Sequence, residues 1–480
     1  MKVAVAANVA GMVAAIGTML ISVPVSLALL GPAAYGILAI VLAVLGYFSA
    51  LDFGVGLALV RLLARELPET PAAGRLFWTA ALVGTTLGFG LALVAIGFVV
   101  GLGAERLGSF GPDLVRAAPL LLLILPALLL GSVLAGALEA RSAFVAVNAA
   151  QAAGTILIQF LPIVAMLLFG PKLTNALAGL AAGRILALAP LAWLCLVKLR
   201  PGRPQIERRR IDGLATIGGW AMVSRVTSSA LETGDRLVIG AVLGPAASGW
   251  YAIAYQVANA SRIVPHAIWR ALFPRIAADD ARSDVSEAVR LVAMVAFPMM
   301  LGVLTLGHVA LGLWMGPQSA RHVVPVLRVF ALGLYFNALA YVALAGLQAT
   351  GRTFLAARWH LLELPVFGIS TWLATAAGGL TGAAWIWSLR LIVDATLLFR
   401  QAALLELLAR NCALPGTLLI ANLMALNAGV ESPVEATTLF VATIAAWVAL
   451  DAAQFRQNDV PSTLAALRAL AQGLGRSRSL

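Results

Sequence analysis

Charged residues and cysteine are both scarce in this 480-residue chain. Only 11% of the residues are charged, and the two cysteines, Cys195 and Cys412, lie in or beside apolar segments. Two such cysteines argue against a disulfide framework, and no group of His and Cys residues has zinc-site spacing, so the sequence predicts no metal centre. Ordinary globular chains carry about 25% charged residues. The shortage of charge therefore excludes a soluble protein.

Apolar sequence is what the chain has in abundance, since 61% of its residues are hydrophobic and the mean hydropathy is +0.96. A helix needs about 20 apolar residues to cross the hydrocarbon core of a bilayer. Apolar stretches of this kind lie at approximately 7–30, 35–62, 76–103, 113–138, 143–169, 173–197, 213–243, 247–275, 288–314, 323–349, 353–377, 380–402, 413–430 and 434–452. The sequence therefore predicts an all-α polytopic membrane protein with about 14 transmembrane helices.

Lys and Arg are distributed unequally between the two sets of loops. The termini and even-numbered loops hold 23 of them, whereas the odd-numbered loops hold 5. By the positive-inside rule both termini are cytoplasmic, which suits a multi-pass protein of the cell inner membrane. The net charge of +12 then reflects topology and the anionic membrane lipids beside the loops, and it predicts no nucleic-acid partner.

A short motif occurs twice in the chain. Residues 30–36 read LGPAAYG and residues 243–249 read LGPAASG, which gives six identities in seven at an offset of 213. A second echo, LAG at 134–136 and 344–346, has an offset of 210. Each LGPAA copy follows the first helix of a series of six, and an even number of helices per repeat gives the two halves parallel topology.

The repeat predicts two parallel-related six-helix bundles around a central cavity. The predicted divisions are an N-terminal bundle at 1–205, a C-terminal bundle at 206–410, two extra transmembrane helices at 411–455 and a cytoplasmic tail at 456–480. Two bundles that face a cavity suit alternating access, in which the cavity opens to each side of the membrane in turn.

At the repeated motif the chain resembles a known family. Residues 29–36 (LLGPAAYG), 46–56 (GYFSALDFGVG) and 235–240 (DRLVIG) look like parts of helices 1, 2 and 7 of the polysaccharide transporter (Wzx-type) flippases. Their superfamily also contains multidrug and toxin extrusion (MATE) antiporters and lipid II flippases. The resemblance implies a MATE-like fold that moves polyprenyl-diphosphate-linked oligosaccharide across the inner membrane, with H⁺ or Na⁺ as a coupling ion. It also implies a polysaccharide polymerase and glycosyltransferases as partners.

Two other functions are alternatives to this expectation. A cation-coupled multidrug antiporter of the same superfamily predicts a cavity dominated by acidic and aromatic residues. A membrane glycosyltransferase or polymerase needs a large loop with catalytic carboxylates, whereas no linker here exceeds roughly 15 residues. The sequence therefore predicts a transporter without catalytic residues or a cofactor.

Ionisable residues inside the predicted spans are the sharpest functional signal, because each costs about 2.5 to 3.5 kcal/mol at the centre of a membrane helix. Five arginines and five acids lie there: Arg184, Arg225, Arg236, Arg262 and Arg390, with Asp52, Glu232, Asp235, Glu363 and Asp394. The intramembrane charge sums to zero, which favours an anionic substrate over the cations that an acid-rich cavity would bind.

Four arginines are the candidate ligands of a substrate diphosphate, because guanidinium groups match phosphate oxygens and stay charged. They are Arg184, Arg225, Arg236 and Arg262. On the predicted helix 213–243, Arg236 lies four residues after Glu232, so an ion pair is the alternative role for both. Arg184 has no acid in its own helix, which makes it the better candidate for binding an anion.

The buried acids have two alternative roles, ion coupling or structural pairing. Asp52 could bind a coupling ion or cap the backbone near two glycines, and Glu363 could bind an ion or extend toward the cytoplasm. Asp394 is expected to pair with Arg390, four residues earlier on the same helix. For Asp235 a structural role is favoured, because it belongs to the motif that the flippases share.

Overall fold

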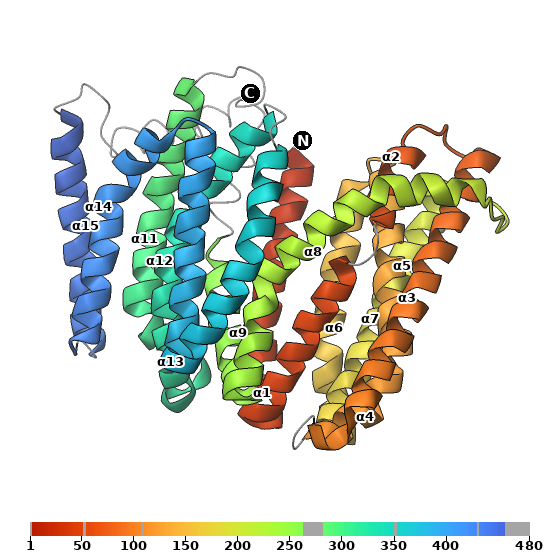
Figure 1. Ribbon diagram of the computed structural model, residues 1–480, viewed down its shortest axis with the longest axis horizontal. Coiled ribbons are helices and arrows are strands. Elements are labelled where there is room, and N and C mark those ends of the chain that lie inside the picture. Colours follow the sequence, from red (N-terminus) through yellow and green to blue (C-terminus); the bar gives the residue numbers. More distant parts are fainter. Residues whose placement is uncertain are drawn as a thin grey trace. The chain divides into compact units, whose positions relative to one another are not determined.

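The computed structural model describes residues 2–50, 54–106, 110–262, 282–349, 353–429 and 432–456. Within these ranges every regular element is a helix (Figure 1). The α-helices are α1 (Lys2–Ala50), α2 (Val55–Leu63), α3 (Pro71–Arg106), α4 (Gly111–Ala117), α5 (Leu121–Glu139), α6 (Phe144–Phe169), α7 (Leu173–Leu199), α8 (Arg209–Leu243), α9 (Pro245–Ala260), α11 (Arg282–Met315), α12 (Pro317–Ala349), α13 (Thr353–Gln401), α14 (Leu405–Asn427) and α15 (Pro433–Arg456). The prediction of an all-α protein is therefore confirmed. A helix suits a lipid environment because it satisfies its own backbone hydrogen bonds.

Ten described segments are long and apolar enough to cross a membrane. Two of them combine two predicted spans each, because α1 continues past Gly31 and α13 past Gly379, where the backbone turns out of the helical region. The φ angles there are 72° and 61°, which glycine adopts without steric cost. If each of these two segments is counted as a pair of spans, the ten segments correspond to twelve of the predicted spans. Helices α8 and α9 lie at the remaining two of the 14 predicted positions.

The chain divides into two compact units. The first comprises Met1–Ala252 with His360–Ala376, and the second comprises Ile253–Trp359 with Ala377–Leu480. Helix α13 contributes residues to both units. The predicted boundaries between bundles, at residues 205 and 410, stay predictions.

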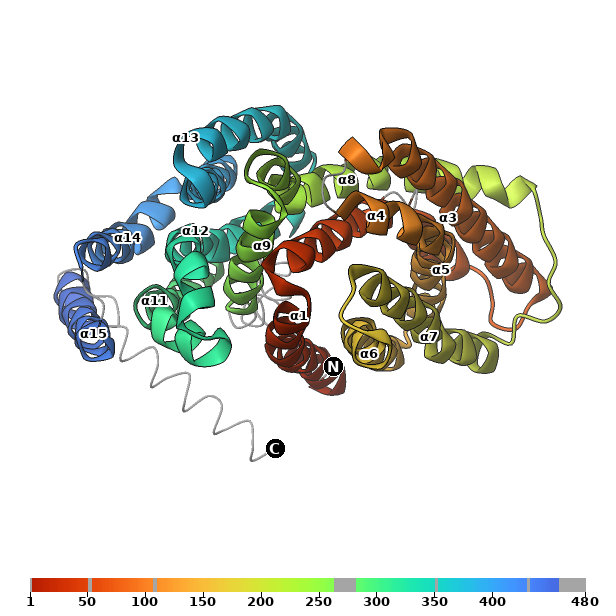
Figure 2. The ribbon, with the colours of Figure 1, turned by 90° about the horizontal axis from the view of Figure 1, so that it is seen from below.

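The first unit is built from antiparallel neighbours, of which α6 and α7 lie side by side in both views (Figures 1 and 2). Helix α3 packs on α5, and α1 packs on α6 and α8. One core cluster draws on α2, α3, α5 and α7, and its side chains that are at most 1% exposed include Leu59, Leu76, Val133 and Leu138. Cys195 lies in the same cluster as a buried free thiol. Its burial fits a packing role.

The linker between α7 and α8 is tied to the start of α3. The indole N–H of Trp78 donates to the carbonyl of Gly202 at 3.3 Å, and the backbone N–H of Glu207 donates to the hydroxyl of Thr79 at 3.0 Å. The Glu207 carboxylate then accepts hydrogen bonds from Arg75 and Arg210, each at 3.1 Å. These bonds fix the point where the chain enters α8.

The second unit is organised around α11, which packs on α12, α14 and α15. Phe297 of α11 contacts the rings of Tyr335 and Trp447, with centroids 6.3 Å and 4.9 Å apart. The amide of Asn422 in α14 donates to the hydroxyl of Thr443 in α15 at 3.0 Å. The last two predicted spans are therefore packed helices of this unit.

Candidate functional site

The two copies of the repeated motif have the same backbone conformation. Gly31 has φ and ψ of 72° and 168°, and Gly244, its equivalent 213 residues later, has 90° and 169°. Each glycine is followed by a proline at the start of the next helical segment, where proline costs no hydrogen bond. The motif is therefore a turn that redirects the chain in the same way in both repeats.

The two copies also pack directly on each other, within the first unit. A methyl group on Gly36 would overlap the backbone carbonyl of Pro245. On the other side, a methyl group on Gly249 would come within 2.9 Å of the Cα atom of Gly36 and 3.3 Å of the Pro32 carbonyl oxygen. Because Pro245 and Gly249 are the repeat equivalents of Pro32 and Gly36, the contact is reciprocal. We call this contact between residues 32–36 and 245–249 the glycine seam.

Close packing continues from the seam along the second half of α1 and the last three turns of α8. The Cδ1 atom of Ile40 lies 2.7 Å from where a Cβ atom of Gly240 would stand, and the Tyr47 hydroxyl lies 3.0 Å from the same point at Gly234. Sequence numbers rise on one helix as they fall on the other, so the two helices run antiparallel. Small residues at such positions let membrane helices approach closely.

Asp235 is the centre of a buried hydrogen-bond network at the α8–α9 hairpin. Its carboxylate is 1% exposed and accepts hydrogen bonds from the hydroxyl of Tyr251 at 2.6 Å and from the backbone N–H of Arg236 at 2.9 Å. The hydroxyl of Ser248 donates to the Arg236 carbonyl at 3.0 Å. These bonds fasten α9 to α8 beside the seam, which supports the structural role favoured for Asp235.

Tyr47 brings α1 into the same polar region. Its hydroxyl is hydrogen-bonded to the Thr233 side chain and lies within electrostatic reach of Asp235 and Arg236. Arg236 is buried at 9% exposure, whereas Glu232, one turn earlier, is exposed. The pairing and substrate-binding roles of these two residues both stay predictions.

Arg184 is the most isolated of the candidate arginines that the structure describes. It lies in the middle of α7, where the flanking Gly183 abuts the backbone of α6 at Leu157 and Ile158. Its Nε atom is buried and has no hydrogen-bond partner among the described residues. Arg184 as a whole is half-buried, and an anion or hydrogen-bond acceptor compensates the partial loss of hydration of its guanidinium, so this position is suited to an anionic ligand.

Arg262 belongs to the second unit and already has partners. Its guanidinium donates to the side-chain oxygen of Asn259 at 2.9 Å and to the hydroxyl of Tyr341, whose ring centroid lies 5.3 Å away. The side chain of Arg225 and all of Asp52 lie outside the described residues. The roles predicted for Arg225 and Asp52 therefore stay predictions.

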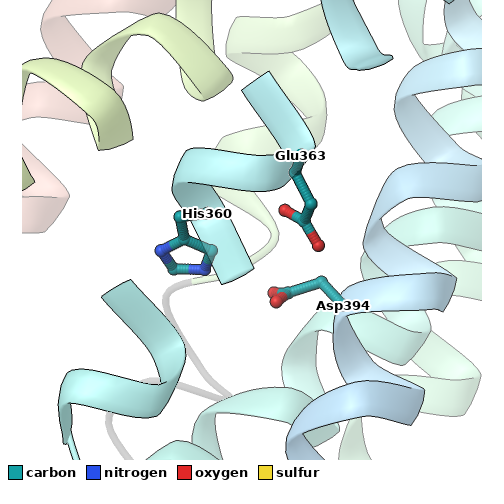
Figure 3. Close-up of side chains that lie close together, drawn as sticks. All are labelled: His360, Glu363 and Asp394. Atoms are coloured by element: carbon teal, nitrogen blue, oxygen red, sulfur yellow. The ribbon is translucent and has the colours of Figure 1, made fainter. Parts of the chain in front are cut away.

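Helix α13 carries the remaining candidates. Figure 3 shows His360 and Glu363, one turn apart before the Gly379 kink, and Asp394 after it. His360 and Glu363 belong to the first unit, where both are half-buried, and Asp394 belongs to the second, where it is 8% exposed. Arg390 is half-buried one turn before Asp394, a spacing that permits the predicted pair.

Sequence reasoning missed the residues that hold the motif in place. Tyr47 appears in the sequence analysis only within the shared motif 46–56, and Tyr251 is given no role there. A polar aromatic residue in an apolar span is a usable signal, because its hydroxyl usually finds a partner when it is buried. Which partner it finds depends on a helix distant in sequence.

Comparisons with known proteins agree with this architecture. The family model described as "Polysaccharide biosynthesis protein" matches residues 27–321, which is 295 of the 480 residues. A relative from Shigella flexneri named "Putative O-antigen transporter" is 26% identical over 376 residues, covering 77% of this chain and 90% of the relative.

Two solved structures share the fold. The lipid II flippase MurJ in an inward closed conformation has a TM-score of 0.73 at 12% identity and covers 96% of this chain and 100% of its own. An inward-facing multidrug resistance MATE transporter of the MOP superfamily has a TM-score of 0.68 at 14% identity, covering 82% and 95%. At these identities the likeness shows the fold, and it confirms the MATE-like prediction.

Proposed function

Because the chain belongs to the family of polysaccharide biosynthesis proteins, we propose that it is a flippase for polyprenyl-diphosphate-linked oligosaccharide. It would carry the head group across the cell inner membrane by alternating access, for cell-surface polysaccharide synthesis. The relatives described above are named as transporters or as a flippase, and none is named as an enzyme. A role in transport therefore fits both the family and the fold.

The observation that carries the proposal is the buried, unpartnered Nε atom of Arg184 in the middle of an apolar helix. A diphosphate supplies the acceptor oxygens that this guanidinium lacks, and charge-assisted bonds to phosphate are among the strongest in proteins. Arg225, Arg236 and Arg262 would receive the same group at other points of its path. The polyprenyl chain would stay in the surrounding lipid.

The excess of Lys and Arg in the even-numbered loops supports a cytoplasmic position of both termini. In that orientation the kink of α1 at Gly31 and the C-terminal end of α8, where the glycine seam lies, would be at the periplasmic side. We propose that it closes the cavity on that side, and that outward opening separates the two copies of the motif. Coupling to H⁺ or Na⁺ would use Asp52, Glu363 or the other buried acids, with a polymerase and glycosyltransferases as functional partners.

The alternative is a cation-coupled multidrug antiporter, which the MATE fold alone would allow. Within the predicted spans five arginines balance five acids, so a cavity between them would lack the acidic excess that attracts cations. The lipid-linked anion is the better match to this charge distribution.

The test is the combined replacement of Arg184, Arg225 and Arg262 by alanine. We expect it to abolish translocation of lipid-linked oligosaccharide into vesicles, and Arg184→Ala alone to slow it about tenfold, the equivalent of one charge-assisted hydrogen bond. Arg400→Ala, at an exposed helix end, is the matched control and should transport normally. Unchanged transport by the triple variant, with normal amounts of protein in the membrane, would rule out the diphosphate role.

A further inference from the structure

A recess lies among α11, α14 and α15 of the second unit. The lining residues are Arg290, Ala293, Met294, Arg410, Asn411, Leu414, Pro415, Trp447 and Asp451. None of them is a candidate for the transport path described above, so the recess needs a separate explanation.

The recess carries a net positive charge, because two arginines and one aspartate line it. Asp451 of α15 lies within electrostatic reach of Arg290 of α11. Arg410 of α14 pairs with Glu406 at 2.6 Å, but the two side chains are 68% and 78% exposed. An exposed pair of this kind is worth little and exchanges readily. Arg410 is thus available to a stronger anion at the mouth.

One turn further along the same three helices, the lining of the recess is apolar and firmly held. Trp447 is 7% exposed and packs on Phe297 of α11, and Met294 and Leu414 extend the same apolar lining. The hydroxyl of Tyr335 donates to the backbone carbonyl of Asn411 at 2.7 Å, which fixes the turn of α14 beside Arg410. A basic mouth beside an apolar wall is the complement of a phospholipid, whose phosphate joins directly to apolar chains.

We propose that this recess binds the phosphate of an anionic phospholipid from the cytoplasmic leaflet. Arg410 and Arg290 would contact the phosphate, and the glycerol and upper acyl chains would lie against Trp447 and Leu414. Basic pockets between transmembrane helices on the cytoplasmic side bind anionic head groups in this way. The proposal rests on the cytoplasmic orientation given under the proposed function, which places the ends of α11, α14 and α15 at that leaflet.

The experiment measures phosphatidylglycerol bound to the purified full-length protein by native mass spectrometry, with phosphatidylcholine as the neutral lipid. Wild type should retain phosphatidylglycerol preferentially. Arg410→Ala should weaken it about fivefold, as expected for one arginine at an anionic surface. Arg400→Ala, an exposed arginine outside the recess, should bind as wild type does. Asp451→Asn should bind more tightly, because it removes the one acidic side chain among the described residues that line the recess.

Phosphatidylglycerol binding should become weaker in Arg410→Ala and tighter in Asp451→Asn. If the two residues had a purely structural role, both variants should lose binding. Equal retention of the two lipids, or equal phosphatidylglycerol binding by Arg410→Ala and wild type, would overturn the proposal. So would displacement of the lipid by millimolar inorganic phosphate or by undecaprenyl diphosphate, which would assign the recess to another phosphate. Translocation of lipid-linked oligosaccharide is measured on the same variants, so that failure of the lipid-binding proposal can be distinguished from failure of the flippase proposal.

Discussion

At one end of α8 the chain is held by backbone contact, and at the other end it is held by charge. The glycine seam places Gly36 and Gly249 against backbone atoms, with no room for a side chain. At the opposite end Arg210 pairs with Glu66 at 2.7 Å and with Glu207 at 3.1 Å, and these side chains are about one quarter to one third exposed. The seam joins the chain segments through small residues, whereas the linker network joins them through partly exposed ion pairs.

The comparison also indicates which end tolerates change. Water can replace a lost ion pair at the exposed end, so the cost is limited. Nothing can move aside at the seam, because the atoms in contact are backbone atoms. We therefore expect substitutions at the seam to be far more damaging than substitutions in the linker network.

The largest effect is expected for Gly36→Ala. The added methyl group collides with the Pro245 carbonyl, and overpacking of this kind typically costs about 1 to 3 kcal/mol, with a backbone obstacle at the upper end. Gly46→Ala is the matched control on the same half of α1, where a Cβ atom meets open space. Alanine is favoured over glycine in helices by about 1 kcal/mol, so the control should be neutral or stabilising.

Thermal unfolding of the purified protein measures both variants. Opposite shifts of the midpoint, downward for Gly36→Ala and upward or zero for Gly46→Ala, would support the seam. Equal shifts of the same sign would show that the two motif copies do not pack closely in the membrane. Gly249→Ala should behave as Gly36→Ala does, since the contact is reciprocal.

A smaller effect is expected for Glu207→Gln, which removes the charge shared by Arg75 and Arg210. Hydrogen exchange at the amides of residues 200–208 should become faster, while the helices keep their protection. Glu69→Gln, in a more exposed pair with Arg200, serves as the control. Unchanged exchange in Glu207→Gln would mean that Trp78 and Thr79 alone hold the linker.

The same linker should respond to acid. Hydrogen bonds from Arg210 first, and then from Arg75, hold the pKa of Glu207 below its ordinary value of 4.5. A carboxylate with a lowered pKa in the folded state contributes its stability fully above the ordinary value and loses it as the pH falls through the lowered one. The protection factors of the linker amides, which correct for the intrinsic pH dependence of exchange, should thus be constant from pH 7 to 5 and fall only below pH 4.5. A loss of protection already at pH 6 would contradict this assignment.

The smallest effect is expected for Arg200→Ala. Its ion pair with Glu69 spans 3.5 Å between side chains that are 72% and 57% exposed. Pairs of this kind contribute between about 0 and 1 kcal/mol, and salt screens them. Thermal unfolding should show a shift close to the error of the measurement. A loss as large as that of Gly36→Ala would invalidate the contrast between the two ends of α8.

Much of the architecture could be predicted from local patterns. Apolar stretches placed the helices, because each must span the same thickness of lipid, and the LGPAA repeat located the two equivalent turns. The positive φ angles at Gly31 and Gly244 agree with a motif that needs glycine there. The isolation of Arg184 was also predictable, since no acid lies within its own helix.

The sequence by itself determined the positions of the spans, the paired turns and which charged residues fall within the spans, because these depend on composition along a single helix. Only the tertiary structure decided that Gly36 meets Pro245, that Tyr251 binds Asp235 and that Arg290, Arg410 and Asp451 line one recess. The physical reason is that the apolar pattern of a span predicts that the helix lies in lipid, but it does not predict which other helix that helix contacts. In a bilayer that choice depends on close backbone approach and buried hydrogen bonds between helices distant in sequence.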